Sequence, residues 1–408
     1  MAVVEGSTLT AAELVALVEA DSLTVDAGLE LLDADDNLIE DITSDFLADG
    51  STIERGIYRT VHGTARLRVS RELVWGSQRL RPYLLLSSTY PPRDAFTPTL
   101  LTESGEVMLT EGGDPILGVE TRPASPATFY RWNLGVFLMS TPERVVQESP
   151  PVWDVDCFDK LDVLNTPYGS TYSLAAGENV VEAVEAIIAA AGESKVNIEP
   201  SDAVTASVRV LSIVDNLTTL QVCNDLLDSI GHRSLWVDRD GFYRAEPYVS
   251  PTDLPIMWSY SADSATTTVG ESRRSSADFY QAANVVVGYN DDPDQDTIPT
   301  EGDGIYTLTN QSDGETSVDG RGGRIIRRVI SGPYVDQAAL ATAVERIMDN
   351  EKRVAVYADI TVGVNPAHGH YDVVNLRDDA VPINGRYLVT NWTLPLDGSD
   401  MALTLRGV

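Results

Sequence analysis

Lysine is nearly absent from this chain. Only Lys160, Lys195 and Lys352 occur among its 408 residues, and all other basic residues are arginine. Acidic residues number 62 against 29 basic ones, so the formal net charge is −33. Binding to a phosphate backbone requires a surface rich in lysine and arginine. The composition therefore argues against a protein that wraps DNA or RNA and indicates a self-repelling acidic surface.

Cysteine and histidine are also scarce. The two cysteines, Cys157 and Cys223, are too few for a disulfide framework or a cysteine-based zinc site. Both stand among apolar neighbours, which predicts buried, unreactive thiols. Apolar residues make up 43% of the chain, and 16 Tyr and six Trp accompany them. This composition predicts a folded protein and not a disordered one.

Long apolar runs and familiar catalytic motifs are missing as well. No stretch approaches the roughly 18 apolar residues of a membrane-spanning helix, and the N-terminus lacks the basic and apolar segments of a signal peptide. The chain contains no G-x-S-x-G, P-loop or G-x-G-x-x-G motif. Among 62 acids, no carboxylate pair for glycoside hydrolysis can be singled out. We therefore predict no enzyme and assign no catalytic, cofactor-binding or metal-binding residue.

What is present predicts a β-rich α+β chain with several domains. Residues 1–22 are predicted as a helical arm and residues 23–150 as a small β-barrel. Within that barrel, the proline-rich segment 90–126 contains a repeat of eight residues and is predicted to be a projecting insertion. Mixed α and β patterns follow in 151–270, and 271–408 combines an α/β segment with a β domain that ends in a hairpin.

The local signals are clearest in the second half. Apolar residues at helical spacing predict helices at 179–191, 217–230 and 336–353. Asp240-Gly241 predicts a hairpin turn, and alternation in 385–408 predicts two strands around Asp397-Gly398-Ser399. Further strands are predicted at 54–63, 64–75, 81–89 and 129–140, with a hairpin around 35–37.

Four short motifs have both a functional and a structural interpretation. His368, His370 and Asp372 could share one side of a strand and bind a metal, but Pro366 and Gly369 favour a turn, and His62 and His232 are distant in sequence. The second motif is the acidic segment 291–296, with Asp292, Asp294 and Asp296, and the third is the acidic segment 33–37. The fourth is Arg321-Gly322-Gly323-Arg324. The two acidic motifs have calcium-loop spacing without the glycine and glutamate of an EF-hand, so solvated loops are favoured. For Arg321-Gly322-Gly323-Arg324, a β-turn is favoured over a phosphate site.

Five segments in order along the chain resemble the baseplate hub proteins of tailed phages, the group that includes the hub of tail-lysin-type proteins. They are 74–86, 173–192, 220–248, 279–291 and the closing hairpin 385–408. The similarity extends over residues 23–408 and lies in the succession of elements, since no single motif is specific.

The resemblance implies two small β-barrels, at the start and end of the chain, that flank α/β middle domains. It implies a homotrimeric ring at the virion tail tip, assembled in the host cytoplasm. Such a hub joins the tail tube and distal tail protein to the tip, anchors the tape measure protein, and carries fibres or receptor-binding proteins. It implies no cofactor and no specific nucleic-acid binding, although DNA passes through the ring, where an acidic lumen would prevent adhesion.

Two alternatives remain open at this point: an acidic cell-surface binding module (an adhesin) and a virion-associated cell-wall hydrolase. Low lysine with high arginine suits an actinobacterial host, whereas the acid excess also suits a haloarchaeal one. The acidity and the β domains fit the adhesin, but the absence of a signal peptide weighs against simple secretion, whereas virion assembly in the cytoplasm needs none.

Overall fold

The structure is a computed structural model, and it describes most of the chain. The described residues are 3–5, 17–18, 23–88, 129–146, 151–205, 209–211, 217–262, 269–278, 282–290, 299–332, 334, 336–352, 355–378 and 383–408. The predicted insertion at 90–126 and most of the predicted helical arm lie outside them. Two parts of the arm are described: Val3–Glu5 is a strand, β1, and Leu17 is buried in the main core.

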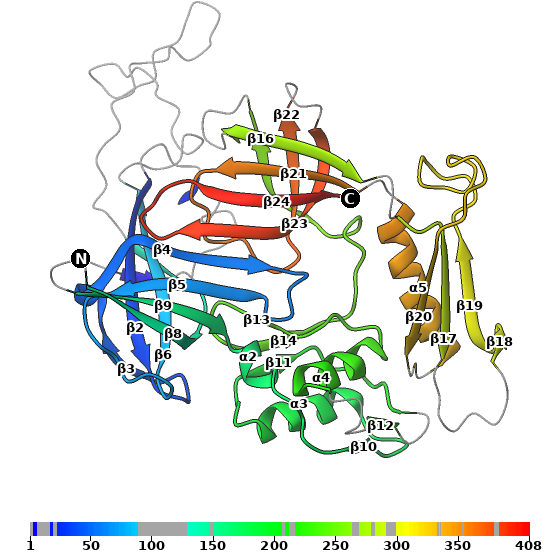
Figure 1. The fold of residues 1–408 in the computed structure, drawn as a ribbon, viewed down its shortest axis with the longest axis horizontal. Coiled ribbons are helices and arrows are strands. Elements are labelled where there is room, and N and C mark those ends of the chain that lie inside the picture. The colour runs from blue at the N-terminus through cyan, green and yellow to red at the C-terminus, as the bar shows by residue number, and fades with distance from the viewer. Residues whose placement is uncertain are drawn as a thin grey trace, which may run out of the picture.

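A sheet of 15 strands, here called the central sheet, runs through the molecule (Figure 1). Its main path is β1-β7-β6-β8-β9-β5-β4-β23-β24-β21-β16, with β2 and β3 attached at β6, and β22 and β15 attached at β23. The strands are β1 (Val3–Glu5), β2 (Leu23–Leu32), β3 (Leu38–Asp41), β4 (Phe46–Gly56), β5 (Gly63–Val69), β6 (Arg79–Ser88), β7 (Phe129–Asn133), β8 (Phe137–Val145), β9 (Val152–Asp159), β15 (Ile256–Ser261), β16 (Val269–Asp278), β21 (Ala355–Val362), β22 (Val373–Asp378), β23 (Ile383–Pro395) and β24 (Met401–Gly407).

The first and last β regions of the chain are joined by hydrogen bonds between β4 and β23. Residues 391–395 of β23 pair antiparallel with 52–56 of β4, and residues 383–388 of β23 pair with β22. Along one edge, β23 therefore pairs first with β22 of the last β region and then with β4 of the first. Its opposite edge pairs with β24. One hydrophobic core extends across the joint, from Ile53 in β4 to Leu394 in β23. Among the described strands, this pairing produces one continuous sheet, and no sheet closes on itself.

The middle unit, residues 160–255, is inserted between β9 and β15. Its elements are α2 (Leu161–Leu164), β10 (Tyr172–Leu174), α3 (Val180–Ala190), β11 (Val196–Ile198), β12 (Arg209–Leu211), α4 (Thr219–Asp228), β13 (Trp236–Val237) and β14 (Tyr243–Ala245). The side chain of Asn179 caps α3, and Thr218 and Gln221 form a capping box on α4. These helices and the β13–β14 hairpin confirm the sequence predictions. The unit has its own core, which includes Ile188 and Leu226.

The outer unit, residues 279–354, is inserted between β16 and β21. Its elements are β17 (Val285–Asn290), β18 (Thr300–Glu301), β19 (Gly304–Thr309), β20 (Arg327–Gly332) and α5 (Gln337–Lys352). The strands form a sheet in the order β18-β19-β17-β20, and α5 covers one face of it. Gly288 permits this packing, because a Cβ there would lie 2.4 Å from Cγ2 of Val344. Since β16 and β21 are antiparallel neighbours, the unit leaves and rejoins the central sheet at adjacent positions.

Three predicted strands differ from the structure. The segment 129–140 is two strands, β7 and β8, because Gly135 adopts a φ of +132° between them. The prediction of a strand over 54–63 is wrong beyond Gly56, where the chain turns, and the one over 64–75 is wrong beyond Val69. The terminal hairpin and the 81–89 strand are confirmed. None of the described helices is long and apolar enough to span a membrane.

Candidate functional site

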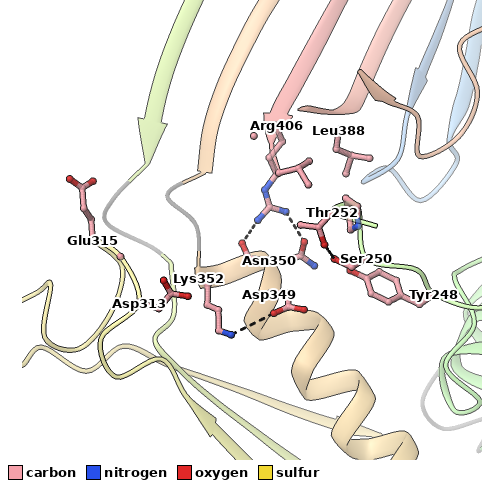
Figure 2. A pocket seen from close by; sticks show the side chains of 14 residues that line it. Tyr248, Ser250, Thr252, Asp313, Glu315, Asp349, Asn350, Lys352, Leu388 and Arg406 are labelled. Atoms are coloured by element: carbon pink, nitrogen blue, oxygen red, sulfur yellow. Dashed lines mark hydrogen bonds and ion pairs between the residues drawn. The ribbon is translucent and has the colours of Figure 1, made fainter. Parts of the chain in front are cut away.

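A cavity of about 540 Å³ lies where the outer unit, the central sheet and the middle unit meet (Figure 2). The last turn of α5 contributes Asn350 and Lys352, and the end of β24 contributes Arg406. The loop 248–252 comes from the middle unit, and the loop 313–315 follows β19. A volume of this size is within the usual range for ligand sites.

The charged groups that line this cavity are largely paired with neighbours. The guanidinium of Arg406 donates to the backbone carbonyl of Asn350 and, over 3.1 Å, to the hydroxyl of Tyr58. Nζ of Lys352 lies 3.7 Å from a carboxylate oxygen of Asp349. The bond from Arg406 to Asn350 joins the end of β24 to α5. We interpret the cavity as a polar joint between units, because its lining residues provide no nucleophile next to a general base.

A second notable site is a buried ion cluster between the central sheet and the middle unit. Nζ of Lys160 lies 2.8 Å from Asp36 and 2.6 Å from Glu193. Arg79 pairs with the same two carboxylates, at 2.7 Å and 2.6 Å. Lys195 approaches Asp36 at 3.5 Å, so two of the three lysines gather here. Lys160, Asp36 and Glu193 are each below 7% exposed. The cluster holds the middle unit against the β2–β3 turn and β6.

This cluster corrects one prediction. Residues 33–37 are predicted as a solvated loop, and Asp33 does organise an exposed turn by accepting hydrogen bonds from the backbone N–H groups of Asp35 and Asn37. Asp36 instead has a φ of +62° and points into the cluster. Burial raises its pKa, but the hydrogen bonds and charges of Lys160 and Arg79 hold the pKa below its ordinary value. The rarity of lysine is the signal that could have marked this site.

The HGHYD motif is a turn that leads into β22, as favoured from the sequence. Its two histidines face different neighbours. Nε2 of His368 lies 2.7 Å from the hydroxyl of Tyr260, and Nδ1 lies 3.3 Å from Asp372. His370 is stacked between the rings of His62 and Trp236, with centroids 4.8 Å and 4.9 Å away. In the described part of the chain, no three histidine, cysteine or acidic side chains are grouped to hold a metal.

The histidine stack lies between the central sheet and the middle unit, with His62 buried and His370 and Trp236 partly exposed. Burial, with a smaller contribution from Arg55, lowers the pKa of His62 to about 4, and burial also lowers that of His370. Nearby, burial raises the pKa of Asp159 to about 6, although Arg55 opposes the change. The guanidinium of Arg55 donates to the carbonyls of Leu134 and Val237 and so links β4, the β7–β8 connection and β13.

The remaining candidate residues from the sequence are the acidic segment, the glycine-rich turn, the two cysteines and His232. The acidic segment 291–296 lies outside the described residues. Arg321-Gly322-Gly323-Arg324 is a turn, with φ of +64° and +90° at its glycines, which confirms the favoured interpretation. Cys157 and Cys223 are free and buried, as predicted, and burial raises the pKa of Cys223 to about 12. His232 lies within the middle unit, with Nε2 3.2 Å from the carbonyl oxygen of Glu199.

Comparison with known proteins gives a fold but no relative in sequence. No protein-family model matches the chain, and no curated protein matches it. Among solved structures, a tail protein from Neisseria meningitidis MC58 superposes with a TM-score of 0.57 at 11% identity, covering 94% of this chain and 96% of that one. The chain has the fold of phage tail proteins.

Two further tail proteins support this assignment of the fold. The 43 kDa tail protein of prophage MuSo2 from Shewanella oneidensis gives a TM-score of 0.54 at 11% identity, covering 94% of this chain and 98% of that one. Prophage tail protein gp18 from Listeria monocytogenes EGD-e gives 0.52 at 11% identity, covering 93% and 94%. Since these matches extend over nearly the whole of both chains, the tail-protein fold includes the central sheet and both inserted units.

Proposed function

We propose that the protein is a structural, non-enzymatic baseplate hub of a tailed virus. In this proposal it forms a trimeric ring at the virion tail tip and joins the tail tube and distal tail protein to the tip. It also anchors the tape measure protein and carries fibres or receptor-binding proteins. The observation that carries the proposal is the agreement in fold with three tail proteins over more than nine-tenths of the chain.

The proposed ring requires each chain to supply two similar β-barrels, one from 23–150 and one from 271–408, with 151–270 as middle domains and 1–22 as an arm. The joint between β4 and β23 favours such a role, because it fixes the two β regions to each other by main-chain hydrogen bonds. The shared core adds buried apolar contacts to the same joint. A ring subunit built in this way would transmit force between its two β regions without a flexible linker.

The decisive experiment is the mass of the purified full-length chain in solution, measured by light scattering. The proposal predicts a particle of three 44.2 kDa chains with threefold symmetry in electron micrographs. Antibody labelling of virions should mark the tip of the tail. A stable monomer that labels elsewhere on the virion would contradict the proposal and favour the adhesin alternative, and zymogram activity on host cell wall would favour the hydrolase.

The excess of acidic over basic residues has a functional role in this proposal. A lumen lined with carboxylates would repel the genome as it passes, and so prevent adhesion. Mapping Asp and Glu onto an experimental trimer tests this idea. A neutral or basic channel would remove it and leave genome composition or a salty habitat as the explanation of the charge.

A further inference from the structure

Within the described residues, α5 covers one face of the sheet of the outer unit and no helix covers the other. Val286 and Ile330 pack toward α5, so the alternate residues of the same strands point away from it. On that opposite face Tyr289 is 37% exposed and Val329 is 62% exposed. The strand register places Val329 beside Val287 of the central strand β17. In Figure 1, α5 lies on the side of this sheet nearer the rest of the molecule. The open face is therefore a β-branched and aromatic surface directed outward.

The edge of the same sheet is also available. Among the described strands, β20 pairs only with β17, so its other edge carries main-chain groups without a strand partner. The turn before β20 and the first two residues of β20 have the sequence RGGRIIRR (321–328), with four arginines in eight residues. Arg328 pairs with Glu351, whereas Arg327 is exposed and no ion pair is recorded for it within the described residues. Residues 321–328 contain no acidic residue, on a chain with a net charge of −33.

Arginines at a strand edge commonly serve to prevent association. That explanation does not account for the large aliphatic side chains that accompany them. Ile325, just before β20, is 48% exposed, and Val329 within β20 is 62% exposed. A protective edge gains nothing from exposed aliphatic groups, which favour contact. A free edge, an apolar face and basic side chains together fit the addition of a strand from another protein.

We infer that the outer unit docks an extended acidic segment of a partner protein along β20. The main chain of that segment adds to the sheet edge, and its apolar side chains pack beside Val329. Its carboxylates oppose Arg327, which lies on the same face of β20 as Val329. The acidic remainder of the surface repels such a segment, which directs it to this edge. The inference is independent of the proposed hub function, since it requires no ring and no particular virion component.

The first test uses fluorescence anisotropy with the full-length chain and a labelled octapeptide, Glu-Ser-Glu-Ser-Val-Ser-Val-Ser, whose Glu and Val side chains share one face of an extended strand, as Arg327 and Val329 do. We expect saturable binding that weakens as salt increases, and no binding of the matched Lys–Val octapeptide. A single-stranded oligothymidylate of ten nucleotides tests for a general anion site. Equal or tighter binding of the oligonucleotide, or equal binding of the two peptides, would overturn the inference.

Matched variants locate the site. Arg327→Glu should weaken Glu–Val peptide binding by at least about tenfold, whereas Arg274→Glu, at an exposed position on β16, should leave it unchanged. Val329→Glu should have a similarly large effect. Val74→Glu is its control, because Val74 is 60% exposed on the central-sheet side of the molecule. Equal effects of a variant and its control would contradict the assignment.

Amide hydrogen exchange distinguishes strand addition from loose electrostatic contact. If the peptide adds to the sheet, amides in 327–331 become protected when it binds, while those of α3 in the middle unit do not change. Circular dichroism spectra of the four variants should match that of the unmodified chain, which excludes unfolding as the cause of lost binding. Binding without added protection in β20 would refute the edge geometry.

Discussion

The middle and outer units both interrupt the central sheet, yet different forces hold them to it. The middle unit is fixed by the buried cluster around Lys160 and by the stack around His370. The outer unit touches the rest of the molecule through polar contacts, such as Arg346 with Asp228 and Arg406 with Asn350, beside a cavity of about 540 Å³. We therefore expect the middle unit to be the more firmly joined of the two and the outer unit to be the easier to displace.

The difference follows from how far each junction excludes water from its charged groups. Separating a desolvated ion pair costs much free energy, since it leaves a buried charge without its partner. Partly exposed contacts, such as Arg346 with Asp228, cost less to separate, because water can replace them. The middle unit is thus expected to unfold together with the central sheet. The outer unit has a small core of its own, with Val286 and Leu340, and is expected to open first.

The largest effect should come from breaking the buried cluster. Lys160→Met leaves Asp36 and Glu193 buried with Arg79 as their main partner, so we expect a loss of about 3–5 kcal/mol in the free energy of unfolding. Chemical denaturation followed by tryptophan fluorescence measures it. Lys352→Met is the control, because that lysine is 35% exposed and should change stability by less than about 0.5 kcal/mol. Equal effects of the two substitutions would show that the middle unit is not fixed by its cluster.

The second test overpacks the outer unit alone. Gly288→Val places side-chain atoms against Val344 and Leu340 of α5, with an expected cost of about 1–3 kcal/mol. Hydrogen exchange should quicken in β17 and α5 and stay unchanged in β4 and β23. Gly363→Val provides the control, since a Cβ at Gly363 would have open space around it. A loss of protection throughout the central sheet would mean that the outer unit is not independent.

The junction of the middle unit should also respond to pH. The pKa of His62 is lowered to about 4 in the folded chain, so stability is lost as pH falls from about 6.5 toward 4. The pKa of Asp159 is raised to about 6, so its contribution is lost as pH rises from about 4 to 6 and opposes that slope. Asp159→Asn should therefore steepen the dependence, by at most about 1.4 kcal/mol per pH unit, and His62→Gln should flatten it. Denaturation at pH 4.5, 5.5 and 6.5 measures the slopes, and unchanged slopes in both variants would refute this assignment.

The smallest effect is expected where the outer unit meets α4. Arg346 pairs with Asp228 and lies 5.5 Å from the centre of the Tyr248 ring, so Arg346→Ala should ease local opening by about 1 kcal/mol. Small-angle scattering should record a larger radius of gyration, with no change in the midpoint of unfolding. Arg66→Ala, on an exposed pair with Asp154, serves as the control. An unchanged radius in both variants would indicate that the outer unit is held by other contacts.

Local structure was largely predictable, and the reason is the short range of the signals involved. Asn179 and Gly192 mark the two ends of α3, and the cap and the left-handed turn each depend on residues within a few positions. Asp240-Gly241 fixes the β13–β14 turn in the same way. The failures also have local causes: Gly135 divides an apolar run that alternation alone predicts as one strand.

The candidate sites were less predictable, because each depends on segments that are far apart in the chain. Asp36 meets Lys160 across 124 positions, and Arg55 meets Val237 across 182. His370 acquires its unusual environment from His62 and Trp236, neither of which is near it in sequence. Composition indicated only that lysine is rare, not that two lysines converge on one carboxylate.

By itself, the sequence determined the helices, the tight turns and the alternation of the strands, since these follow from hydrogen bonds and side-chain spacing over a few residues. The tertiary structure decided which strands became neighbours, above all that 52–56 pairs with 391–395. Strand pairing uses the same main-chain groups whatever the side chains are, so the choice of partner depends on which apolar faces can be buried together. That choice, and the burial of the ion cluster with it, exists only in the folded chain.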